Sequence, residues 1–270
     1  MSDIERRSFL FRNLLLALVL ALAPWFSPFV SSAQHNQEHQ AESDVHYARS
    51  EHAHVVSQLP QWEGSAEGRA YSEFSHQISA LFVLLIGLGE LRSSAGVRRR
   101  DWWAYLLPGA LMAAGIWLLI WSDHDAWPVG HMSFLDTFVR ATNEIAQHKL
   151  YGLLALSVGA IELARRREVL RSPVWLFPLP MFAIVGGFML FSHDHGAHPH
   201  AAHIAVHHFQ MGVVAIAGGI AKTLAGWKAV REPPARAGLE HAGTRNIFWW
   251  NLTWSLLVLT IAVQLLLYRD

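Results

Sequence analysis

Apolar stretches of similar length, separated by short polar loops, make up the chain from about residue 75 onward. Each approaches the ~20 residues that an α-helix needs to cross the hydrocarbon core of a bilayer. The six stretches cover about 75–92, 102–122, 146–165, 174–192, 205–225 and 247–268. At this length only helices satisfy their backbone hydrogen bonds in lipid. The pattern predicts an all-α fold, a polytopic membrane protein with six transmembrane helices.

One spacing recurs at the start of three of these stretches. A histidine comes first, a glycine follows eleven positions later and a polar residue fourteen positions later; the sets are His76, Gly87 and Glu90; His148, Gly159 and Glu162; and His208, Gly219 and Lys222. A proline lies 32 positions after each of the first two histidines, and a Ser/Asp/His cluster ends those two units. We therefore predict three repeated helical hairpins at about 76–125, 148–195 and 208–270, the third without the proline and the cluster.

Lysine and arginine are concentrated in alternate loops. The first, third and fifth loops carry them, at 92–100, 165–171 and 222–245, whereas the second and fourth loops hold mainly Asp and His. Cytoplasmic loops are enriched in basic residues. We expect the His-rich loops and the C-terminus to lie on the periplasmic side of a bacterial inner membrane.

The first 70 residues do not follow the hairpin pattern. Residues 1–33 combine a basic start, an apolar core and small residues at 31–33, which is typical of a cleaved signal peptide; an uncleaved anchor helix is the alternative. Residues 34–70 are rich in His, Glu, Gln and Ser without clear periodicity, which predicts a disordered extracytoplasmic segment. The six-helix membrane domain is expected to cover 71–270.

Composition narrows the possible chemistry. The formal net charge is zero and the basic residues are dispersed, so a nucleic-acid partner is not expected. The chain has no cysteine, which excludes disulfides, thiolate metal sites and a cysteine nucleophile. Histidine is abundant instead, at 17 of 270 residues, and this directs attention to imidazole chemistry.

Histidine and carboxylate side chains are ligands for borderline divalent metals such as Zn²⁺ and Cu²⁺. The expected topology places the three opening histidines and the two closing clusters at one membrane face. We predict a metal site there; the candidate ligands are His76, His148, His208, Asp123, His124, Asp125, His193, Asp194, His195, His203 and His207. Interfacial histidines can also simply reach the lipid headgroups, which is the alternative for each of them taken singly.

Two further spacings bear on such a site. His203 and His207 would share a helix face four residues apart and can chelate one ion. Carboxylates that precede two of the opening histidines by three or four residues can fix the imidazole tautomers; these are Glu73 and Glu144.

The polar residues that end the repeated spacing are Glu90, Glu162 and Lys222. They lie ~21 Å along a helix from their histidines, near the opposite membrane face. We expect their side chains to extend into the cytoplasmic headgroup layer. The middle of each predicted span lacks Asp, Glu, Lys and Arg, so a charged transport pathway is not indicated.

Three segments resemble membrane proteins grouped with the copper-resistance protein D family: Tyr71-Ser72-Glu73-Phe74-Ser75-His76, Trp121-Ser122-Asp123-His124-Asp125-Ala126-Trp127-Pro128 and Gln147-His148-Lys149-Leu150-Tyr151. The resemblance covers about residues 71–225. It implies a polytopic inner-membrane protein associated with periplasmic copper handling, with the three opening histidines and the Asp/His clusters as matching positions. Few methionines lie near the outer face, which favours copper(II) or zinc over copper(I).

The leading hypothesis is an inner-membrane protein that binds a transition metal at its periplasmic face, in copper homeostasis or uptake. Copper is the first candidate and zinc the second; the expected partners are the lipid bilayer, the metal ion and a periplasmic metal carrier. One alternative is a b-type cytochrome in which two of the opening histidines ligate haem b. A metal-dependent membrane oxidoreductase and a structural role in a larger complex are further alternatives, and the sequence identifies no catalytic residue or substrate.

Overall fold

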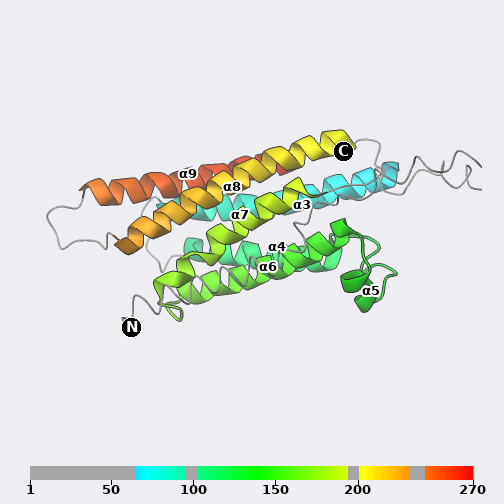
Figure 1. Ribbon diagram of the computed structural model, residues 1–270, viewed down its shortest axis with the longest axis horizontal. Helices are drawn as coiled ribbons and strands as arrows, with labels where there is room; N and C mark the ends of the chain where they lie inside the picture. Colours follow the sequence, from blue (N-terminus) through cyan, green and yellow to red (C-terminus); the bar gives the residue numbers. More distant parts are fainter. Residues whose placement is uncertain (1–64, 95–101, 194–200, 232–240, 270) are drawn as a thin grey trace, which may run out of the picture. The chain divides into compact units, whose positions relative to one another are not determined.

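A computed structural model of the chain describes residues 65–94, 102–193, 201–231 and 241–269 (Figure 1). Within these ranges the chain forms helices and connecting turns, without a β-strand. The predicted all-α fold is confirmed. The predicted signal peptide, residues 34–64 and the candidate ligands Asp194 and His195 lie outside the described residues. The prediction of disorder over 34–70 is wrong at 66–70, because these residues form the first turn of the helix Ala66–Ser94.

The described helices all belong to the unit Ala66–Asp270. Its elements are α3 (Ala66–Ser94), α4 (Leu106–Trp121), the short α5 (Phe134–Val139), α6 (Asn143–Arg166), α7 (Pro178–Phe191), α8 (Ala201–Arg231) and α9 (His241–Leu266). Two 3-10 turns, η3 (Trp102–Tyr105) and η4 (Pro173–Leu176), lead into α4 and α7 and lengthen those segments.

Five helical segments are long and apolar enough to cross a membrane: Ala66–Ser94, Trp102–Trp121, Pro173–Phe191, Ala201–Arg231 and Asn246–Leu266. These correspond to five of the six predicted spans. The sixth predicted span is α6, which has 24 residues and is therefore long enough. Its composition is too polar for it to count with the other five, because polar side chains occupy both of its ends, including Gln147, His148 and Lys149 near the start.

Local sequence signals place the start of α6 and thereby the height of its histidine. The Thr142 hydroxyl accepts a hydrogen bond from the backbone N–H of Ile145 at 3.4 Å and caps the helix, as threonine commonly does. Glu144 follows in the first turn, where a negative charge suits the helix dipole. His148 then lies one turn further along, on the same face as Glu144.

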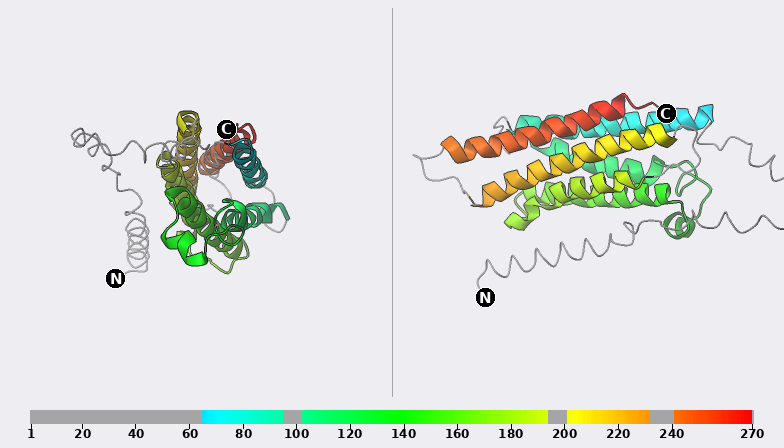
Figure 2. Two further views of the ribbon diagram at one scale, coloured as in Figure 1. Left: turned by 90° about the vertical axis from the view of Figure 1, so that its right-hand side faces the viewer. Right: turned by 45° about the horizontal axis from the view of Figure 1, so that its top comes forward.

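Close helix packing holds the histidine-bearing ends together. The helices pair as α3 with α9, α4 with α6 and α7 with α8, and they run side by side in both views of Figure 2. A Cβ added to Gly115 of α4 would lie 2.7 Å from the Leu156 nitrogen of α6, and one added to Gly187 of α7 would lie 2.7 Å from the Gly212 oxygen of α8. These backbone contacts leave little freedom for α6 and α8 to shift.

Candidate metal centre

Four helices bring histidine rings together at one end of the bundle. The ring centroids of His148 and His193 are 5.1 Å apart, those of His193 and His208 are 4.7 Å apart, and those of His208 and His76 are 6.2 Å apart. The three opening histidines therefore gather in one row, as their spacing predicts. His193, which directly follows α7, is the link between His148 and His208.

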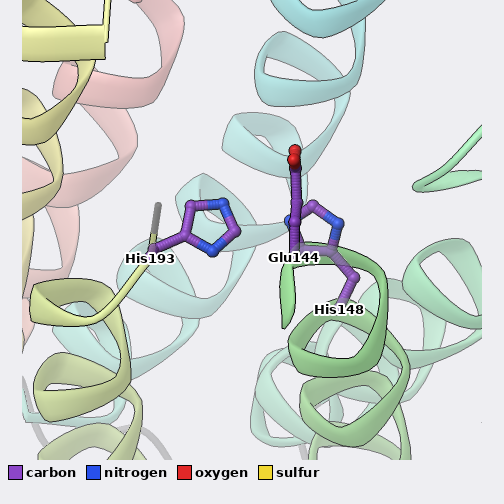
Figure 3. Close-up of side chains that lie close together, drawn as sticks. All are labelled: Glu144, His148 and His193. Atoms are coloured by element: carbon purple, nitrogen blue, oxygen red, sulfur yellow. The ribbon is translucent and has the colours of Figure 1, made fainter. Parts of the chain in front are cut away.

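The tightest group of possible ligands within the described ranges is Glu144, His148 and His193. One ligand atom from each lies within 4.8 Å of the others, and the three side chains lie close together in Figure 3. Metal–nitrogen bonds of about 2.0–2.1 Å in a tetrahedral site would bring ligand atoms to about 3.3 Å from one another. A contraction by side-chain rotation would close this group around one ion.

Hydrogen bonds fix the tautomer of three of these histidines. The Nδ1 atom of His148 lies 2.8 Å from the Asp123 carboxylate, that of His193 lies 2.8 Å from the Gln147 amide oxygen, and that of His76 lies 2.8 Å from the Ser72 carbonyl. These oxygens only accept hydrogen bonds, so each Nδ1 carries the proton and donates it. Nε2 then keeps the lone pair that a metal needs, which is the usual arrangement around metal-bound imidazoles.

Asp123 supports the centre from behind His148. Its side chain is only 8% exposed and also receives a hydrogen bond from Ser122 and an ion pair from the buried Lys149, whose Nζ lies 3.7 Å away. Burial alone raises the pKa of Asp123, but its interactions with His148, Ser122 and Lys149 outweigh that effect and hold the pKa below its usual range. Asp123 is therefore ionised and directed at His148.

The other candidate ligands lie in separate small groups. His124 and Asp125 pair at 3.0 Å in the loop after α4, and Asp125 also lies 3.3 Å from His131. His203 and His207 face each other on α8, with their Nε2 atoms 3.1 Å apart.

Several contacts at this end were not foreseen from the sequence. Gln147 and Lys149 flank His148 and contact its surroundings. The run of three polar residues at 147–149, within an apolar stretch, was the feature of the sequence that could have indicated these contacts. Tyr268 stacks on His76 with ring centroids 3.9 Å apart. It lies at the end of the predicted third hairpin, the one that lacks an Asp/His cluster. The carboxylate expected beside His76, that of Glu73, pairs with Arg269 at 2.8 Å.

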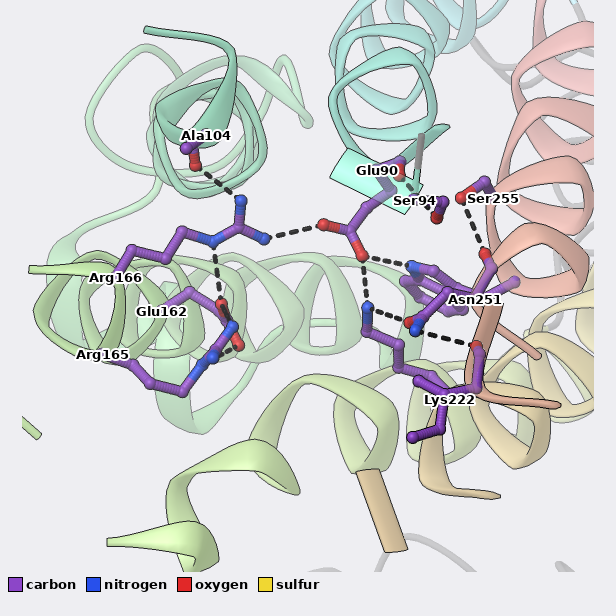
Figure 4. Close-up of polar contacts among 11 residues, drawn as sticks. Glu90, Ser94, Ala104, Glu162, Arg165, Arg166, Lys222, Asn251 and Ser255 are labelled. Carbon is purple, nitrogen blue, oxygen red and sulfur yellow. Dashed lines mark hydrogen bonds and ion pairs between the residues drawn. The ribbon is translucent and has the colours of Figure 1, made fainter. Parts of the chain in front are cut away.

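The opposite end of the bundle contains a buried network of charges (Figure 4). Glu90, 3% exposed, accepts hydrogen bonds from Arg166, Lys222 and the Trp254 indole. Glu162, 2% exposed, pairs with Arg165 and Arg166. The prediction that these carboxylates extend into the headgroup layer is wrong, because helices α3, α6 and α8 carry complementary charges at one depth and neutralise one another.

Comparison of the chain with models of protein families, with curated proteins and with solved structures gives no match. The function of the chain is therefore inferred from the geometry of its side chains.

Proposed function

We propose that this protein binds a transition metal at Glu144, His148 and His193, with copper favoured and zinc possible. The observation that carries the proposal is the convergence of these three side chains with the Nδ1 atoms of both histidines held by acceptors. Two imidazoles and a carboxylate suit borderline divalent ions. His208 and His76, next in the row of rings, are the nearest further ligands.

The proposed setting is a bacterial inner membrane, with the centre on the periplasmic side and α6 as the sixth span. The basic loops at the opposite end support this orientation. A less apolar helix can span when its polar side chains face protein rather than lipid. Lys149 and Glu162 of α6 are both buried among neighbouring helices, which supports a spanning α6.

The three-hairpin repeat, also part of the proposal, draws support from the glycine contacts. In α6 and α8 the glycine four residues after the opening histidine meets a glycine of the preceding helix; the pairs are Gly115 with Gly152 and Gly187 with Gly212. Equivalent positions thus make equivalent contacts. In such a membrane protein the centre would serve copper homeostasis or uptake, with metal exchanged with a periplasmic carrier.

Metal content of the purified protein tests the proposal. We expect the detergent-solubilised full chain, loaded with Cu²⁺ or Zn²⁺ and desalted, to retain tightly bound metal by mass spectrometry. His148→Ala and His193→Ala should lose that ion, whereas His131→Ala, a histidine of the exposed loop, should keep it. Equal metal content in all four proteins, or none in any, would refute a centre at this position.

Absorption spectroscopy of the same preparation separates the proposal from the haem alternative. A Soret band that appears after haem supplementation and disappears in His76→Ala or His208→Ala would favour the b-type cytochrome. A metal-loaded protein without that band supports the metal centre.

A further inference from the structure

A continuous row of aromatic side chains leads from the exposed start of α8 to the candidate centre. The centroid distances are 4.6 Å from His203 to His207, 5.9 Å from His207 to Tyr268 and 3.9 Å from Tyr268 to His76. From His76 the row continues through His208 and His193 to His148. Successive rings are thus within 6.2 Å of each other over the whole row.

The outer end of this row has the geometry of a chelate. His203 and His207 lie one helical turn apart, and their Nε2 atoms are 3.1 Å apart. With metal–nitrogen bonds of about 2.0–2.1 Å, that separation corresponds to a nitrogen–metal–nitrogen angle of about 100°. This angle lies between the square-planar and the tetrahedral values, so one ion could bind both nitrogens with little movement of either ring.

Without metal, the same distance fits a hydrogen bond from one ring to the other. The donating ring then carries its proton on Nε2 and the accepting ring on Nδ1. When an ion binds both Nε2 atoms, the donating ring moves its proton to Nδ1, so both rings stay neutral and no proton is lost. The exchange converts one hydrogen bond into two metal–nitrogen bonds.

We infer that His203 and His207 form a second metal site, a loading site that takes a divalent copper or zinc ion from the aqueous side. Binding at this site follows from the pair alone, whereas its loading role rests on the metal centre proposed above. His203 is exposed and His207 half-buried, so solvated ions can reach the pair. Two ligands hold an ion more weakly than the three of the inner group, which suits a site that must release it.

Tyr268 separates the loading site from the inner row. Its side chain is fully buried between His207 and His76, and it contacts both rings. Beyond it, the centroids of neighbouring imidazole rings lie 4.7–6.2 Å apart, so an ion would pass from ring to ring in short steps. The direction of transfer is inward, because the number of available ligands increases toward Glu144, His148 and His193.

Calorimetric titration of the metal-free full chain with Cu²⁺ or Zn²⁺ tests the second site. We expect one tight and one weaker ion in the native protein. The double variant His203→Ala/His207→Ala should lose the weaker ion and keep the tight one, and His148→Ala/His193→Ala should do the reverse. His131→Ala is the control and should bind as the native chain does. A double variant at 203 and 207 that still binds both ions would overturn the inference.

Stopped-flow measurement of loading tests the proposed role. Native protein should fill the tight site faster than the variant that lacks His203 and His207, although both reach the same final occupancy. Equal loading rates would overturn the loading role. If instead the His148/His193 variant keeps the tight ion while the His203/His207 variant loses the weak one, the centre proposed above fails and the second site stands.

Discussion

Gln147 offers the sharpest test of how the candidate centre is built. Its amide oxygen receives the Nδ1–H of His193 at 2.8 Å, but it has no direct part in holding an ion. Gln147→Ala removes this acceptor and leaves both histidines and Glu144 in place. Gln147→Glu keeps an acceptor at the same position, with a stronger negative charge.

The expected loss in metal affinity for Gln147→Ala is about 10–100-fold, or ~1.4–2.7 kcal/mol. The size follows from two effects: the imidazole becomes less basic, and its ring is free to rotate away. Gln147 is buried, so water replaces the lost acceptor poorly and we expect the upper half of that range. Gln147→Glu should bind the ion as tightly as the native chain or more tightly.

Competition between the protein and a chromophoric chelator gives the affinity for Cu²⁺ and Zn²⁺ directly. Ser192→Ala is the matched control, because Ser192 accepts a hydrogen bond from the Gln147 amide at 3.3 Å but does not contact the His193 proton. It should leave the affinity unchanged. Native affinity in Gln147→Ala, together with lost binding in His193→Ala, would show that the amide does not orient this ligand.

Three further predictions concern stability. Gly115→Ala should lower the free energy of unfolding by about 1–3 kcal/mol, because its Cβ would meet backbone atoms of α6. Gly109→Ala should not lower it, because nothing lies within 4 Å of the new Cβ. Equal melting temperatures for the two variants would contradict this packing. Glu90→Ala should cost about 3–5 kcal/mol, because it leaves the partly buried Lys222 without its carboxylate and removes one of the two carboxylates that pair with Arg166. Glu67→Ala, at an exposed position, should be neutral in the same melts. Cu²⁺ at 100 times its dissociation constant should stabilise the native chain by about 2.7 kcal/mol; His193→Ala should show no such gain, and an equal gain would place the ion elsewhere.

The sequence predicts the helices well where a single physical requirement dominates. Five helices long and apolar enough to cross a membrane follow from length and apolarity alone, and the meeting of His76, His148 and His208 at one end follows from the spacing that their three segments share. α6 is harder to predict, because it is less apolar where Lys149 and Glu162 are buried against neighbouring helices. Such burial depends on how the helices pack, and the composition of one helix carries no information about that packing.

The contacts between side chains of different helices could not be predicted in the same way. Glu90 of α3 and Arg166 of α6 are 76 positions apart in the sequence, and their pairing depends on how each helix is rotated about its axis. The same holds for Gln147 and His193, which meet only because the start of α6 and the end of α7 lie at matching heights. Spacing along one helix gives depth in the bundle; it does not give the direction in which a side chain points.

The charge network at the end away from the histidines has a consequence for how the chain assembles. Three helices that share one histidine–glycine spacing are similar enough to compete for each other's places in the bundle. They differ in sign at the fourteenth position, where Glu90 and Glu162 are acidic and Lys222 is basic. An exchange of α8 with α3 or α6 would bury like charges side by side, at a cost that close-packed apolar contacts do not offset. One lysine among two glutamates thus distinguishes α8 from α3 and α6 and favours its observed place among the three helices.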